Sequence, residues 1–128
     1  MRTQNTKSLG KYYTSHHISK LLVDNFSTKK AKCVLELGVG DGALISEAAK
    51  RWTGATYFTA DIEAEKTSWD FAIKNHQHLK LDALSVDISE QLGLSKKKAD
   101  ISICNPPYVR TEWKRTFEYI LELSLIHI

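Results

Sequence analysis

The stretch CVLELGVGDG, residues 33–42, decides the fold that this sequence predicts. Five mostly apolar residues run into a turn with three glycines, and from Ala43 to Trp52 apolar residues recur at helical spacing among good helix formers. A strand, a tight turn and a helix are therefore expected in that order. Glycines let a turn adopt positive φ angles and approach a ligand closely, so this turn is a candidate nucleotide site.

The rest of the chain repeats the alternation of strand and helix. Ser15 can cap a helix, and the apolar residues Ile18, Leu21, Leu22 and Phe26 behind it share one helical face. Further along, the pattern predicts strands at residues 56–60, 79–81 and 101–104, helices at 64–74 and 89–94, and a loop at 96–98. Such alternation predicts an α/β fold, with a parallel sheet covered by helices on both faces.

The composition limits the size, partners and compartment of the protein. Its 128 residues are 42% apolar and fit one domain, and the net charge of +3 is too small to establish a nucleic-acid partner. The start is polar and no stretch is long enough to cross a bilayer, so a cytoplasmic protein without a membrane partner is expected. Cys33 and Cys104 lie in apolar runs, which suits buried reduced thiols, and no metal site is expected.

Two carboxylates are expected beside the glycine turn. Asp61 ends the second strand and can accept hydrogen bonds from ribose hydroxyls, whereas Glu36 is placed to meet a cationic group such as the amino end of a methionine moiety. A dinucleotide is the competing ligand, because Gly38, Gly40 and Ala43 also satisfy G-x-G-x-x-A. Glu36 argues against it, since an anion beside a pyrophosphate is unfavourable.

A second motif, Asn105-Pro106-Pro107-Tyr108, follows the apolar run that ends at Cys104 and should project from the same sheet edge. The prolines fix φ and stiffen the segment. Its carbonyls and the Asn105 amide oxygen form a cluster of acceptors that suits an amino group, and Tyr108 can stack on a planar base. Acceptors at both N–H bonds of a conjugated amine would stabilise the charge that develops during methyl transfer.

On these residues the sequence resembles the class I S-adenosylmethionine-dependent methyltransferases, and within them the DNA adenine-N6 methyltransferases of restriction-modification systems. Residues 35–42, with Glu36, Gly38 and Gly40, are similar to the cofactor motif of that family. Residues 105–108 are similar to its catalytic motif. The resemblance implies a Rossmann-like fold and S-adenosylmethionine as cofactor.

The resemblance implies roles for further residues. Asp61 corresponds to the ribose-binding acid and Asp82 to the acid that contacts the adenine amino group of the cofactor, with Asp87 close by as another carboxylate. Residues 9–15 are similar to the segment that packs over the methionine end of the cofactor. The contacts there would come from Tyr12, Tyr13 and Thr14.

The same resemblance suggests how the chain is organised and what it acts on. Residues 1–30 would form the cofactor-covering segment and its helix, and residues 31–128 a partial core, truncated after the fourth strand and without a target-recognition region. The expected partners are double-stranded DNA with a flipped adenine and a cognate restriction endonuclease. Three alternatives stay open: a protein-glutamine N5 methyltransferase, an RNA methyltransferase, and a non-catalytic cofactor-binding fragment.

Overall fold

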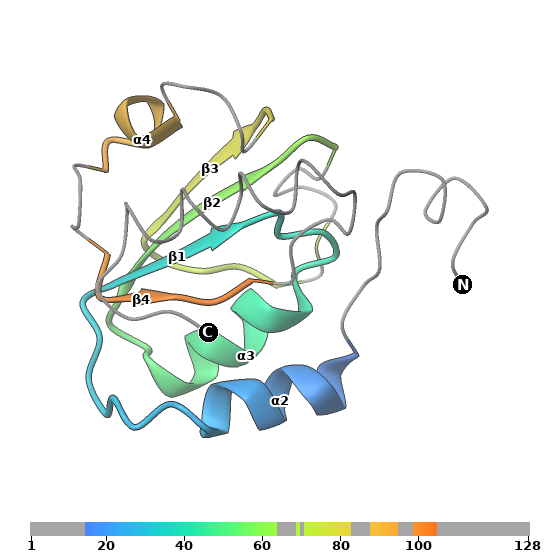
Figure 1. Ribbon diagram of the computed structural model, residues 1–128, viewed down its shortest axis with the longest axis vertical. Coiled ribbons are helices and arrows are strands. Elements are labelled where there is room, and N and C mark those ends of the chain that lie inside the picture. Colours follow the sequence, from blue (N-terminus) through green and yellow to red (C-terminus); the bar gives the residue numbers. More distant parts are fainter. Residues whose placement is uncertain (1–14, 64–68, 70, 83–87, 95–98, 105–128) are drawn as a thin grey trace.

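The computed structural model describes residues 15–63, 69, 71–82, 88–94 and 99–104 (Figure 1). In chain order, their helices and strands are α2 (His16–Asp24), β1 (Cys33–Leu37), α3 (Ala43–Arg51), β2 (Thr56–Asp61), β3 (His76–Lys80), α4 (Ile88–Gln91) and β4 (Ile101–Ser102).

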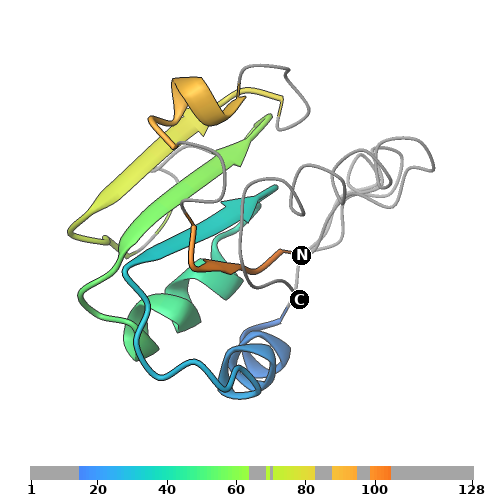
Figure 2. The same ribbon diagram turned by 60° about the vertical axis from the view of Figure 1, so that its left-hand side comes forward.

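The strands form one parallel sheet in the order β3-β2-β1-β4 (Figure 2). All five residues of β1 are buried, which is typical of a central strand of a parallel sheet. The Asp100 carboxylate joins β1 to β4 by accepting the backbone N–H groups of Lys32 and Cys33, at 2.7 and 2.9 Å. The strand-turn-helix unit predicted from residues 33–42 is confirmed, and so is the parallel α/β sheet.

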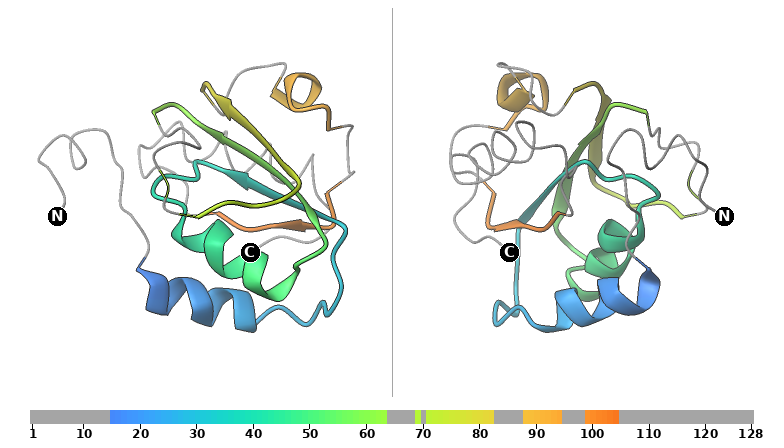
Figure 3. Two further views of the ribbon diagram at one scale, coloured as in Figure 1. Left: turned by 180° about the vertical axis from the view of Figure 1, so that it is seen from behind. Right: turned by 45° about the vertical axis from the view of Figure 1, so that its right-hand side comes forward.

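The sheet is covered on both faces. On one face α3 lies between α2 and the sheet, as Figures 1 and 3 show, and the core there includes Val23, Ile45 and Tyr57. On the other face Leu92 and Leu94, directly after α4, pack against Leu35 and other residues of the sheet. The predicted helices on both faces are therefore present, although the second face is covered mainly by the segment behind a short helix.

The orientation of α2 agrees only in part with the sequence prediction, because Phe26 and Leu22 contact the core but the other two residues of the predicted face do not. Ser15 caps the helix as predicted, because its side-chain oxygen accepts the Ile18 backbone N–H at 3.2 Å. The buried residues are Ser19 and Val23, however, while Ile18 and Leu21 are 45% and 55% exposed. Ser19 tolerates burial because its hydroxyl donates to the Ser15 carbonyl at 2.8 Å. This hydrogen bond allows a polar residue to face the core.

The segment between β2 and β3 also differs. A helix was expected over residues 64–74, but the residues described there, 69 and 71–74, are not helical. Trp69 and Phe71 stack with their ring planes 5° apart, and residues two apart in a helix do not face each other. Strand β3 correspondingly begins at His76, three residues before the predicted start.

None of the helices in the described part of the chain is long and apolar enough to cross a membrane. Among the described residues, neither Cys33 nor Cys104 takes part in a disulfide, and Cys33 is buried.

Candidate functional site

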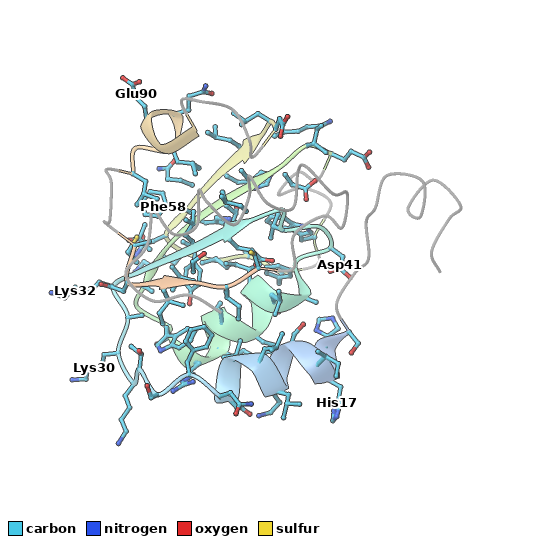
Figure 4. The ribbon with its side chains drawn as sticks, in the orientation of Figure 1. His17, Lys30, Lys32, Asp41, Phe58 and Glu90 are labelled. Carbon is cyan, nitrogen blue, oxygen red and sulfur yellow. The ribbon has the colours of Figure 1, made fainter. Side chains whose placement is uncertain are left out.

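The glycine turn lies at the carboxyl edge of the sheet, between the end of β1 and the start of α3. Figure 4 shows Asp41 of this turn at that edge, with Lys30 and Lys32 at the opposite edge. Gly38, Gly40 and Gly42 have φ angles of 79°, 56° and 83°, which other residues rarely adopt. The tight turn with positive φ angles at its glycines, which the sequence predicts, is confirmed by these angles.

The backbone N–H groups of this turn are directed at acceptors within the protein. The hydrogen bonds run from Gly38 and Val39 to the Ala60 carbonyl (2.7 and 3.3 Å), from Gly40 to Asp61 Oδ2 (2.8 Å), from Gly42 to the Val39 carbonyl (3.0 Å) and from Ala43 to Asp41 Oδ1 (3.2 Å). A phosphate-binding turn offers such N–H groups to its ligand. Because five of them are already bonded here, the geometry disfavours the dinucleotide alternative.

Negative charge is concentrated at the same place. The Glu36 side chain is 1% exposed, and its Oε2 has no hydrogen-bond partner among the described residues. Burial raises the pKa of Glu36 well above its usual value, and the nearby Asp41 and Asp61 raise it further. An orphaned acceptor in an anionic setting suits a ligand that brings a cation or a hydrogen-bond donor.

Asp61 connects the turn to the sheet. One of its oxygens accepts the Gly40 N–H and the other accepts the Glu63 N–H, at 2.8 Å in both cases. Asp61 is the last residue of β2, which neighbours β1, so the structure brings it together with Glu36, Gly38 and Gly40. Asp82 follows β3, whose carboxyl end lies at the same edge one strand further out, and its side chain is exposed.

Seven predicted site residues lie outside the described part of the chain: Tyr12, Tyr13, Thr14, Asn105, Pro106, Pro107 and Tyr108. The structure does describe the residues that lead up to the last four, as far as Cys104. Burial and the charge of Glu36 raise the pKa of the Cys104 thiol to about 12. The preceding residue, Ile103, donates its N–H to the Leu35 carbonyl of β1 at 3.0 Å, and Cys104 directly precedes Asn105.

Two aromatic residues beside the turn were not identified as site residues from the sequence. The Trp69 indole N–H donates to the Gly40 carbonyl at 3.1 Å. A Cβ atom at Gly42 would lie only 2.6 Å from Cζ of Phe71. Both residues were visible as large aromatics in the sequence, but the predicted helix gave no reason to place them at the turn.

The shape and chemistry of this edge agree with comparisons to known proteins. The family model described as Methyltransferase small domain matches residues 15–123. Among curated proteins, ribosomal RNA small subunit methyltransferase A of Mycoplasma capricolum subsp. capricolum is 30% identical over 112 residues, covering 79% of this chain and 40% of that protein. Its counterpart in Mycoplasma mycoides subsp. mycoides is 28% identical over 109 residues, with the same coverage of 79% and 40%. This chain thus spans less than half the length of these relatives.

Solved structures share the fold. A protein described as a methyltransferase from an antibiotic biosynthesis pathway of Anabaena variabilis superposes with a TM-score of 0.64 at 12% identity, over 88% of this chain and 44% of its own. The CurJ carbon methyltransferase superposes with a TM-score of 0.55 at 24% identity, over 85% of this chain and 31% of its own. At these identities the likeness concerns the Rossmann-like architecture alone.

Proposed function

The chain belongs to the Methyltransferase small domain family, with S-adenosylmethionine as the cofactor. From residues 105–108 we propose that it methylates the N6 amino group of adenine in DNA. The observation that carries the proposal is the parallel pairing of β4 with β1: Leu35 pairs with Ser102, and the Ile103 N–H donates to the Leu35 carbonyl at 3.0 Å. The chain therefore runs beside β1 to within two residues of Asn105. An acceptor-rich segment would thereby stand beside the cofactor-binding turn.

The residues at the turn fit this cofactor. When bound, S-adenosylmethionine supplies a methyl group activated by a positively charged sulfonium. Glu36, whose Oε2 accepts no hydrogen bond from the described residues, would receive the ammonium of the methionine end, and Asp61 would receive the ribose hydroxyls. Gly38 and Gly40 permit close approach of the backbone.

Residues further from the turn complete the proposed cofactor site. Asp82 would accept from the adenine amino group of the cofactor. Tyr12, Tyr13 and Thr14 would cover its methionine end, following the family resemblance.

The acceptor side of the proposal rests on residues 105–108. The Asn105 amide oxygen and the Pro106 carbonyl would accept the two hydrogens of the adenine amine, which keeps its lone pair directed at the methyl group. Pro107 stiffens the segment. Tyr108 would stack on the base once it is flipped out of the duplex. A restriction endonuclease of the same specificity is the proposed partner.

A second candidate acceptor is ribosomal RNA. The relatives at 30% and 28% identity are ribosomal RNA methyltransferases by name, which favours RNA over the protein-glutamine alternative. An activity assay distinguishes the two acceptors. Purified polypeptide carrying these residues is incubated with methyl-labelled cofactor and either duplex DNA or small-subunit ribosomal RNA. Label on adenine N6 of the DNA supports the proposal, whereas label on the RNA alone replaces it with the second candidate.

Substitution of Asn105 tests the catalytic assignment. Asn105→Ala should lower the single-turnover rate by about 10²–10³-fold and leave cofactor affinity nearly unchanged, because its amide oxygen is assigned to the acceptor amine alone. Tyr108→Ala should instead weaken capture of the acceptor base, by roughly 1–3 kcal/mol. Near-normal chemistry in Asn105→Ala would remove residues 105–108 from the reaction.

A further inference from the structure

The Gly40 residue of the glycine turn is held from both ends by side chains. Its N–H donates to Asp61 Oδ2 at 2.8 Å, and its carbonyl accepts the Trp69 indole N–H at 3.1 Å. Trp69 lies 29 residues further along the chain, in the connection between β2 and β3. Both restraints on Gly40 therefore come from chain beyond the turn itself.

The Trp69 ring is fixed by its neighbours. It stacks with Phe71 and with His76, each at a centroid distance of 5.5 Å, with planes 5° and 6° apart. His78 meets the ring edge-on at 5.1 Å. Three aromatic rings contact the indole, and these contacts restrict its rotation while its N–H is bonded to the turn.

The neighbours of Trp69 are fixed in turn. The Thr59 hydroxyl is hydrogen-bonded to His76 Nε2 at 2.6 Å and to His78 Nδ1 at 2.7 Å. Thr59 is fully buried and pairs in register with Glu36 on β1. A continuous row of contacts thus runs from the buried carboxylate through two strands to the indole ring.

We propose that Trp69 is a positioning residue for the cofactor: its N–H sets the Gly40 peptide in the binding conformation before the ligand arrives. A turn that is already ordered loses less conformational freedom on binding, so affinity rises without a direct contact between Trp69 and the ligand. The inference rests on the cofactor of the family and not on the acceptor. A wrong choice between DNA and RNA would leave it untouched.

The test compares two tryptophans that make the same kind of hydrogen bond. Trp52 donates its indole N–H to the Thr28 carbonyl at 3.2 Å, at the far end of α3 from the turn. Trp69→Phe and Trp52→Phe each delete one N–H and keep an aromatic ring. By calorimetry, Trp69→Phe should raise the dissociation constant of S-adenosylmethionine about three- to tenfold, whereas Trp52→Phe should leave it unchanged.

A spectroscopic measurement supplements the substitutions. In the unmodified chain, the Trp69 indole proton should exchange slowly with solvent, and more slowly still after the cofactor is added, as followed by NMR. The inference is overturned if both variants lose similar stability in urea while neither changes cofactor affinity, because Trp69 would then only support the fold. Rapid indole exchange with and without the cofactor overturns it as well.

Discussion

Glu36 is a buried carboxyl group whose environment is unfavourable to its charge. It is buried against the sheet, and Asp41 and Asp61 are its anionic neighbours. A carboxyl group of this kind lowers the stability of the free protein whenever it ionises. The cost is tolerated if a cationic ligand arrives there, which is a common reason for keeping a perturbed acid in a binding site.

The first prediction concerns the pH dependence of stability. Because the folded-state pKa of Glu36 is raised, its stability contribution is complete below the ordinary pKa of 4.5 and is lost as the pH rises through the folded value. The unfolding free energy of Glu36→Gln should therefore decline less than that of the wild type between about pH 4.5 and neutrality. Urea unfolding without cofactor across this range measures the difference.

The control for this prediction is Glu90→Gln, at an exposed position on α4. It should follow the wild-type pH profile. Parallel profiles for Glu36→Gln and the wild type would show that the buried carboxyl group is not the source of the pH dependence.

The second prediction concerns Asp61. Asp61→Ala should weaken S-adenosylmethionine binding by about 1.5–3 kcal/mol, because it removes a charge-assisted contact and also frees the Gly40 N–H. Asp24→Ala, which removes a half-exposed carboxylate on α2, is the matched control and should bind normally. Unchanged affinity in Asp61→Ala, with folding verified by circular dichroism, would exclude Asp61 from the cofactor site.

Among the elements, the junction between α2 and α3 is linked by several hydrogen bonds from one side chain. Arg51, the last residue of α3, donates to the carbonyls of Val23, Phe26 and Thr28, and its guanidinium lies 4.8 Å from the Trp52 ring centroid. These carbonyls belong to the end of α2 and the loop after it, which lack partners within the helix. Arg51 therefore fastens α2 to the layer beneath it.

The third prediction follows from this junction. Arg51→Ala should lower the unfolding free energy by about 2–3 kcal/mol, because several carbonyls lose a charged donor at once. Arg51→Lys should recover only part of the loss, since an ammonium cannot reproduce the planar fork. Lys20→Ala, on α2, removes an exposed ion pair with Asp24 and should leave the unfolding free energy nearly unchanged. Equal losses in the two alanine variants would refute the fastening role.

The helices and strands also show which features of the fold could be predicted from the sequence. The unit β1, turn and α3 was predictable, because its glycines and its apolar run constrain the backbone locally. The face of α2 was predictable only in part. Phe26 and Leu22 contact the core, but Ile18 and Leu21 are exposed, and the burial of Ser19 depends on a hydrogen bond to Ser15.

The segment around Trp69 is a second feature, at the candidate site, that could not be predicted from the local sequence. Helix-compatible residues predicted a helix there, whereas stacking on Phe71 and His76 favours a different backbone. Tertiary contacts of this kind have no local signature. The acids at the strand ends were predictable because the carboxyl ends of parallel strands meet at one edge.

For the molecule as a whole, the fourth prediction is selective stabilisation by ligand. At a concentration one hundred times its dissociation constant, S-adenosylmethionine should stabilise the chain by about 2.7 kcal/mol, which corresponds to a rise in melting temperature on the order of 10 °C. The dinucleotide NAD at the same concentration should have little effect, because the N–H groups of the turn are already bonded. Thermal scans with each ligand make the comparison, and a larger rise with NAD would restore the dinucleotide alternative.

The pairing of β1 with β4 has a consequence for how the protein is synthesised. The two strands are joined by Asp100, which reaches back 68 residues to Lys32. About 65 residues must be translated between the end of β1 and the end of β4, which takes roughly 3–13 s on the ribosome. Throughout that interval β1 cannot pair along the side that β4 will occupy. Such an unpaired strand is a site for aggregation, so the nascent chain should depend most on chaperones during these seconds.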